Sequence, residues 1–171
     1  AIVTVLDSIK PTAITQNKTI YLAANGLASI TTADIDNGSF DNCSIATITL
    51  DSTQFDCSEI GANTVYLKVI DVNGNASTSS AIVTVLDSIK PTAITQNKTI
   101  YLAANGSASI TIADINNGSL DNCAIASISL DSTNFDCTEI GANTVQLTVT
   151  DVNGNASTSS ATVTVIDSIK P

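Results

Sequence analysis

The sequence predicts an all-β protein built from tandem β-sandwich domains that follow one another as a rod, with a period of 80 residues. Three observations support this prediction. The run AIVTVLDSIKP at residues 1–11 recurs at 81–91, and 68 of the 80 positions of residues 1–80 recur in 81–160. Each period holds short runs rich in Val, Ile and Thr, separated by turn signals. Five of the 12 differences between the copies fall on alternate residues of two strand-like runs.

The expected strands of the first repeat end at turn signals. Asn and Gly tolerate the positive φ that tight turns require, and Asn73-Gly74 is the best hairpin candidate because strong strand runs flank it. Turns are expected at Asn25-Gly26, Asn37-Gly38, Asp51-Ser52, Gly61-Ala62 and Asn73-Gly74. Strands are expected near Thr12–Gln16, Thr19–Leu22, Ala28–Thr32, Ile45–Leu50, Gln54–Cys57, Thr64–Ile70 and Thr78–Leu86.

The differences between the copies indicate which strand face is buried. A strand with one free face tolerates change at every second residue, so the unchanged residues should point into the core. In these two runs the changed residues are Tyr66, Lys68 and Ile70 (Gln146, Thr148 and Thr150 in the second copy) together with Thr47 and Thr49. The unchanged residues are Val65, Leu67, Val69, Ala46, Ile48 and Leu50.

The motif Asp-Ser-Ile-Lys-Pro marks the boundaries of the repeats, because a strand ends there and Pro restarts an extended segment. Residues 1–7 are then the last strand of a truncated preceding repeat, 8–87 are repeat 1, 88–167 are repeat 2, and 168–171 begin the next linker. The link is about four residues long, too short for a flexible tether. We therefore expect consecutive repeats to form a stiff rod.

The composition argues against several classes of function. The chain has no His and no Arg, which usually supply a general base or an anion clamp near neutral pH, so we expect no enzyme. A net charge of −10 leaves no basic face for nucleic acid. No apolar run approaches the ~20 residues of a membrane span, so we expect no membrane insertion.

The four cysteines recur with the same spacing in both repeats, as Cys43 and Cys57 and then Cys123 and Cys137. Two cysteines per repeat without His form a poor zinc set, so we favour a disulfide within each repeat. A disulfide that closes a ~15-residue loop stabilises the folded state by roughly 3 kcal/mol in the chain-entropy model. The alternative is a pair of buried free thiols in a cytosolic protein. A disulfide would indicate an extracellular location.

Two acidic loops per repeat are candidate calcium sites, and calcium is the only cofactor that we consider. Oxygen ligands spaced around a turn suit a hard cation, and Asp87 and Asp167 are placed to complete a site at a junction. The alternative, which the lack of a twelve-residue calcium loop favours, is a set of Asx-turns. The candidate ligands are Asp34, Asp36, Asp41, Asp71, Asn73 and Asn75, with Asp114, Asn116, Asp121, Asp151, Asn153 and Asn155 in the second repeat.

Five segments together resemble the hyalin-repeat (HYR) class of immunoglobulin-like domain. They are DNC at 41–43, FDC at 55–57, GANTV at 61–65, DVNGN at 71–75 and VTVLD at 83–87, and they recur in the second repeat. The version found in long, repetitive surface adhesins of gliding Bacteroidetes, often exported by the type IX system, is the most similar. Ser79 and Ser159 stand where many relatives have a further Cys. The resemblance implies an immunoglobulin-like fold and a place at the cell surface.

The resemblance also implies O-glycosylation, which these bacteria carry out at Asp-Ser/Thr followed by an aliphatic residue or Thr. Matching serines are Ser8, Ser52, Ser88 and Ser132. Asp-Ser is also an ordinary turn opener, which leaves the simpler interpretation open. Asn-x-Ser/Thr triplets occur as well, at a density expected by chance in so Asn-rich a chain.

The sequence favours a structural repeat that spaces a distal binding region of an adhesin away from the cell surface. Near-identical copies are more useful for lengthening a structure than for forming a single binding or catalytic site. The expected partners are neighbouring repeats of the same chain. The alternative is an adhesion module whose repeats bind glycans or surface proteins. Exposed aromatic residues usually serve carbohydrate binding, but we expect only Tyr66 to point outward, with Tyr21 and Tyr101 in the core.

Overall fold

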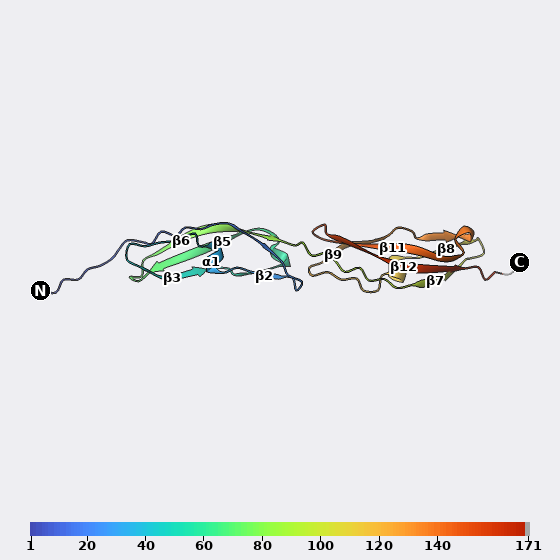
Figure 1. Ribbon diagram of the computed structural model, residues 1–171, viewed down its shortest axis with the longest axis horizontal. Coiled ribbons are helices and arrows are strands. Elements are labelled where there is room, and N and C mark those ends of the chain that lie inside the picture. Colours follow the sequence, from blue (N-terminus) through green and yellow to red (C-terminus); the bar gives the residue numbers. More distant parts are fainter. Residues whose placement is uncertain (170–171) are drawn as a thin grey trace. The chain divides into compact units, whose positions relative to one another are not determined.

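The computed structural model describes residues 1–169, and the chain forms two compact units, Ala1–Asp87 and a second that begins at Ser88 (Figure 1). The elements of unit 1 are β1 (Lys18–Tyr21), β2 (Leu27–Ser29), α1 (Thr32–Ile35), β3 (Ile45–Leu50), β4 (Gln54–Asp56), η1 (Cys57–Glu59), β5 (Gly61–Asp71) and β6 (Ala76–Leu86). Those of unit 2 are β7 (Lys98–Tyr101), β8 (Ser107–Ser109), α2 (Ile112–Ile115), β9 (Ile125–Leu130), β10 (Asn134–Asp136), η2 (Cys137–Glu139), β11 (Gly141–Asp151) and β12 (Ala156–Ile166).

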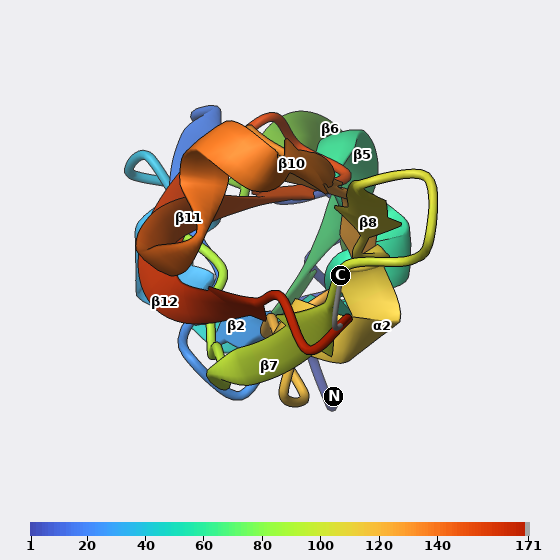
Figure 2. The ribbon, with the colours of Figure 1, turned by 90° about the vertical axis from the view of Figure 1, so that its right-hand side faces the viewer.

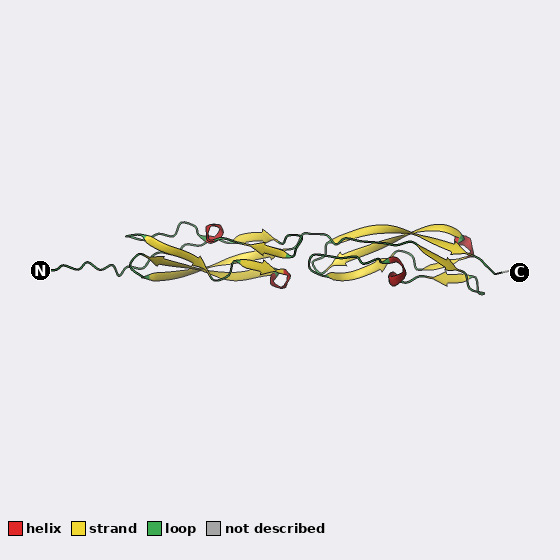
Figure 3. Ribbon diagram, turned by 90° about the horizontal axis from the view of Figure 1, so that it is seen from below, coloured by secondary structure: helices red, strands yellow, loops and turns green. Residues whose placement is uncertain are grey.

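Each unit is an immunoglobulin-like β-sandwich, as the sequence predicts. A four-stranded sheet of order β1-β6-β5-β3 faces the two-stranded sheet β2-β4, and unit 2 repeats this with β7-β12-β11-β9 and β8-β10. Figure 3 shows how the strands dominate each unit, and Figure 2 shows β11 and β12 on one side of unit 2 and β8 and β10 on another. Within the described residues, no helix is long and apolar enough to cross a membrane.

The β5–β6 hairpin confirms the predicted turn and the predicted core face. Gly74 adopts φ +91°, and Ile70 pairs with Ala76 on either side of the turn. Leu67 is completely buried, whereas its neighbour Tyr66 is 50% exposed. The alternation between the two copies therefore identified the buried face of β5.

Strand β3 departs from the predicted alternation. Ile45 pairs with Asp71 and Thr47 with Ile70, so Ala46 is an extra residue in a β-bulge. Ala46 is consequently exposed rather than buried, while Ile48 and Leu50 are half-buried because β3 is an edge strand. The prediction of a core position for Ala46 was wrong because a bulge shifts the two-residue period.

The N-terminal part of unit 1 also differs from expectation. The segment expected as a strand at Thr12–Gln16 makes only two isolated bridges, Thr12 with Phe40 and Thr15 with Asp36. Thr32, expected at the end of a strand, instead begins α1 after the capping residue Thr31. Residues 1–7 pair with no strand of unit 1, and the apolar side chains among them are almost fully exposed, so their assignment to a preceding repeat stays a prediction.

Candidate functional site

Three carboxylates from separate segments meet in unit 1. One oxygen from each of Asp7, Asp41 and Asp71 lies within 4.8 Å of the others. Asp7 precedes the first bridge of the unit, Asp41 lies between α1 and β3, and Asp71 ends β5. We refer to these three residues as the carboxylate cluster. The fold, rather than any one loop, assembles it.

Asp71 is the most buried member of the carboxylate cluster, with 2% of its surface exposed. Its Oδ1 accepts the backbone N–H groups of Asn73 (2.9 Å) and Asn75 (2.8 Å), and its Oδ2 accepts the amide of Asn75 at 2.8 Å. Burial raises the pKa of Asp71, but these hydrogen bonds outweigh it and lower the pKa overall. This loop therefore is the Asx-turn of the alternative interpretation, and it also presents a charged carboxylate to the cluster.

Asp41 is satisfied on one side only. Its Oδ2 accepts the backbone N–H groups of Cys43 (2.9 Å) and Ser44 (3.2 Å). Its Oδ1 is buried and has no hydrogen-bond partner among the described residues. A buried acceptor without a partner costs free energy, and a bound cation would remove that cost.

Asp7 attaches the N-terminal segment to the body of unit 1. Its Oδ1 accepts the N–H of Ile9 at 3.0 Å, and its backbone carbonyl accepts the amide of Asn75 at 3.2 Å. The pKa of Asp7 is lowered, first by the Ile9 N–H and then by the hydrogen bond from Cys43; burial opposes them, and the Asn42 amide lowers the pKa by a smaller amount. The same contact with Asp7 raises the pKa of the Cys43 thiol.

The carboxylate cluster is compact enough for its three carboxylates to share one hard cation. Oxygens on opposite sides of Ca²⁺ lie about 4.6–5.2 Å apart, because each Ca–O distance is about 2.3–2.6 Å. The three carboxylate oxygens lie within 4.8 Å of one another, so they are close enough to contact one cation of this size together. Three carboxylates near one another repel unless a cation or protons intervene.

The other candidate ligands of unit 1 have different roles. Asp34 pairs with Lys18 at 2.9 Å and caps α1 by accepting the Thr31 N–H at 2.9 Å. Asp36 accepts the N–H of Ser39 at 3.0 Å and its hydroxyl at 2.5 Å. The 34–41 loop therefore does not act as one ligand set, because only Asp41 joins the carboxylate cluster.

Unit 2 repeats these local arrangements. Asp121 Oδ2 accepts the N–H groups of Cys123 (2.9 Å) and Ala124 (3.1 Å), and its buried Oδ1 has no partner among the described residues. Asp151 is 2% exposed and accepts the N–H groups of Asn153 and Asn155, both at 2.8 Å. Asp114 pairs with Lys98 at 2.7 Å, and Asn116 accepts from Ser119. The period of 80 residues gives Asp87 the place of Asp7 in the sequence.

The predicted pairing of cysteines within each repeat is wrong. Cys43 and Cys137 are free and exposed, whereas Cys57 and Cys123 are disulfide-bonded. Cys43 adjoins Ser44, whose carbonyl accepts the Val72 N–H at the turn end of β5–β6, whereas Cys57 precedes the opposite end of β5.

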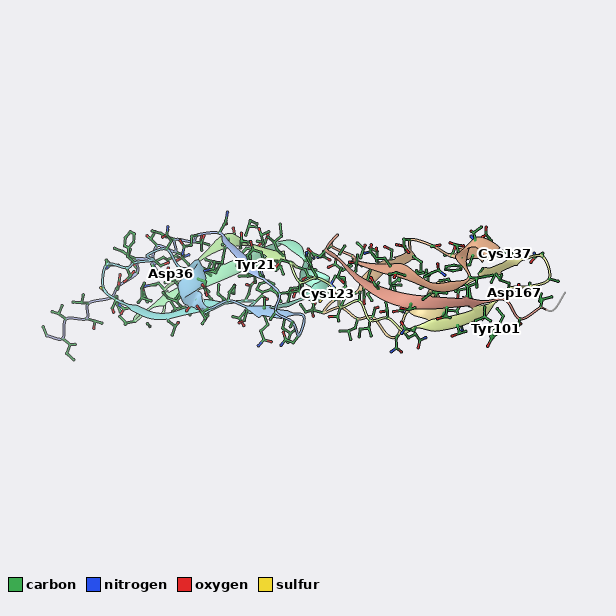
Figure 4. All side chains as sticks on the ribbon, turned by 45° about the vertical axis from the view of Figure 1, so that its right-hand side comes forward. Tyr21, Asp36, Tyr101, Cys123, Cys137 and Asp167 are labelled. Carbon is green, nitrogen blue, oxygen red and sulfur yellow. The ribbon has the colours of Figure 1, made fainter. Side chains whose placement is uncertain are left out.

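The length of β5 explains why pairing within the repeat fails. Eleven residues of strand extend roughly 35 Å, whereas a disulfide needs Cα atoms within about 7 Å. Figure 4 shows Cys123 and Cys137 at opposite ends of unit 2 in the same way. A constant spacing in sequence therefore did not indicate proximity in space.

Two tyrosines expected in the core lie on the surface. Tyr21 is 59% exposed and Tyr101 is 60% exposed, although Ile20 and Ile100 beside them are buried. Each tyrosine is the last residue of its strand and follows a buried isoleucine, so the period of two directs it outward. The sequence contains this information, because in a strand a Tyr that directly follows a core Ile faces the opposite side.

The predicted O-glycosylation serines differ in exposure. Ser8 and Ser88 are exposed, whereas Ser52 and Ser132 are half-buried. A glycosyltransferase needs access to the hydroxyl, so Ser8 and Ser88 are the better placed of the four.

No protein-family model matches the chain, and no curated protein matches it. Among solved structures, it is similar to human protocadherin-24 EC1-2 (TM-score 0.48, 10% identity, covering 92% of this chain and 98% of that one). It is similar to human mucin-like protocadherin EC1-2 (TM-score 0.43, 14% identity, 92% and 97%). It also spans about half of the protocadherin gamma B7 extracellular cadherin domains 1–4 (TM-score 0.41, 10% identity, 92% and 51%).

Proposed function

We propose that this chain is a stalk segment of a large extracellular surface adhesin of the hyalin-repeat type, and that it transmits tension along its length. The pairing of the first and last strands of each unit carries the proposal. β1 runs parallel to β6, with Lys18 opposite Val83 and Tyr21 opposite Leu86. β7 pairs with β12 in the same way.

Parallel terminal strands give a unit mechanical strength. Because the chain enters at the start of β1 and leaves at the end of β6, a pull on the two ends shears the strands along each other. Shear loads all the inter-strand hydrogen bonds at once, whereas peeling would break them one by one. The disulfide-bonded cysteines Cys57 and Cys123 support an oxidising, extracellular location.

Single-molecule pulling from the two ends tests the stalk function. Leu22 donates its N–H to Leu86 at 2.9 Å, and because successive N–H groups alternate in direction, the Lys18 N–H also faces β6. Lys18→Pro should lower the unfolding force of unit 1 well below that of Thr49→Pro, which removes an N–H from the edge strand β3. Lys18→Met controls for the lost ion pair. Equal forces in the two Pro variants would contradict the proposal.

We further propose that the carboxylate cluster binds calcium. Asp41 Oδ1 has no protein partner among the described residues, and Asp7 brings the segment that precedes the unit against the buried Asp71. A cation held by these residues would fix that segment to the body of the unit. The glycans implied by the hyalin-repeat resemblance at Ser8 and Ser88 stay part of the proposal, and intact mass of native material tests them.

A further inference from the structure

A pocket on the surface of unit 2 lies beside the exposed Tyr101. Its volume is about 610 Å³, and its lining includes Tyr101, Asn105, Ser107, Ser109 and Asn134. These residues come from the end of β7, the turn that follows it, and the two-stranded sheet β8-β10. Figure 4 shows Tyr101 on the outer surface of this region. We refer to this feature as the Tyr101 pocket.

The lining of the Tyr101 pocket is uncharged, although the chain as a whole carries a net charge of −10. Hydroxyl and amide groups alternate there with alanine side chains and an aromatic ring. Such a surface offers hydrogen bonds to a neutral polar ligand and an apolar face for its carbon skeleton. It offers no ion pair to a charged ligand.

The Tyr101 pocket is held in place by short contacts. The turn beneath it is closed by Gly106 N–H to the Ala103 carbonyl at 2.8 Å, with Gly106 at φ +75°. Asn105 Oδ1 accepts both the N–H (3.2 Å) and the hydroxyl (2.8 Å) of Ser107. No partner of Asn105 Nδ2 is found among the described residues, so both of its N–H groups are left for a ligand.

Unit 1 has a smaller pocket at the equivalent place, and its lining does not include Tyr21. It measures about 290 Å³ and includes Asn25, Leu27 and Gln54, at the positions of Asn105, Ser107 and Asn134. Two of these three residues are larger in unit 1, and Leu27 has no hydroxyl to hold Asn25. The two repeats therefore provide a wider pocket that includes the tyrosine and a narrower one that does not.

We propose that the Tyr101 pocket binds a neutral saccharide. A sugar ring presents C–H groups on one face, which stack on an aromatic ring, and hydroxyls at its edge, which pair with an amide such as Asn105. The negative charge of the chain disfavours sialylated or sulfated sugars. This binding activity goes beyond the stalk function and does not depend on it.

The test uses the complete 171-residue protein on an array of neutral oligosaccharides of glucose, galactose, mannose and N-acetylglucosamine, with sialylated and sulfated counterparts. We expect binding to neutral glycans that falls at least tenfold in Tyr101→Ala and in Ser107→Leu. Leu occupies the matching position of unit 1, so Ser107→Leu should fold. Tyr66→Ala, which removes an exposed ring elsewhere, should bind as the original chain does.

A gain of function provides a second arm. Leu27→Ser combined with Gln54→Asn gives the pocket of unit 1 the same residues that Asn105, Ser107 and Asn134 provide in unit 2, removes bulk beside Tyr21, and should increase the signal on the same neutral glycans. Absence of any neutral-glycan signal from the original chain, a preference for the acidic glycans, or binding that survives both Tyr101→Ala and Ser107→Leu would each overturn the proposal.

Discussion

Lys18 and Asp34 form an ion pair with their nitrogen and oxygen 2.9 Å apart, which ties β1 to the first turn of α1. The same carboxylate caps α1 through Thr31. First the contact with Lys18 and then the Thr31 hydrogen bonds lower the pKa of Asp34 to about 2. Lys98 does the same to Asp114, whose pKa is also about 2.

This pair predicts a loss of stability in acid. Because the pKa of Asp34 is lower in the folded chain than the ordinary value of 3.8, its stabilisation is complete above about pH 4 and is lost as the pH falls toward 2. The partly exposed pair contributes on the order of 0.5 kcal/mol. Urea unfolding at pH 6 and pH 2.5 should show a smaller pH effect in Asp34→Asn/Asp114→Asn than in the original chain. An unchanged pH effect would contradict this origin.

Calcium should raise the melting temperature. For a Kd of about 0.1 mM, 2 mM free calcium stabilises the folded state by about 1.8 kcal/mol, which corresponds to several degrees in a small domain. Scanning calorimetry in calcium and in chelator measures the shift. Asp41→Asn/Asp121→Asn should abolish it. Asp36→Asn is the matched control, because Asn116 already makes the equivalent contact to Ser119 in the second repeat. An equal melting temperature with and without calcium would exclude the site.

The cysteines should be distinguishable by alkylation without reductant. Cys43 and Cys137 are exposed thiols and should be labelled, whereas the disulfide-bonded Cys57 and Cys123 should not. Peptide mapping by mass spectrometry reads all four sites. A Cys43–Cys57 linked peptide would contradict the structure. Cys43→Ser/Cys137→Ser should remove the label and leave the melting temperature nearly unchanged.

The stability of unit 1 should be sensitive to substitution of Leu67 and tolerant of substitution of the neighbouring Tyr66. Leu67 is completely buried, so Leu67→Ala should destabilise the unit by about 2–5 kcal/mol through lost burial and a cavity. Tyr66→Gln copies the second repeat on the exposed face and should change stability by less than about 0.5 kcal/mol. Urea unfolding compares both variants with the original chain, and similar losses in the two would argue against the assigned faces.

The sequence predicted the sandwich and the β5–β6 hairpin because those depend on local periods and turn residues. It did not predict the bulge at Ala46, which breaks the period that the prediction used. The carboxylate cluster was only half predicted. Asp41 and Asp71 were both candidates, in separate loops. Asp87, one period after Asp7, was expected to complete a site at a junction, but Asp7 itself was taken as the end of a strand. Its approach to Asp71 depends on tertiary packing across the unit.

The cysteine prediction failed for a similar reason. A spacing of 14 residues suggests a small closed loop when the intervening chain turns back. Here β3 and β4 carry the chain from one end of the unit to the other, so sequence distance and spatial distance diverge. Tyr101 was misplaced for the opposite reason, because a one-residue offset from Ile100 is enough to move it from the core to solvent.

The edges of the four-stranded sheet affect how readily one copy of the chain associates with another. β1 has four residues and β3 has six, with a bulge at Ala46, so each edge offers only a short or irregular row of backbone groups to another chain. Long flat edges recruit strands from neighbouring molecules, and short bulged ones do not. Together with the net charge of −10, these edges disfavour the joining of one copy of the chain to another in a common sheet.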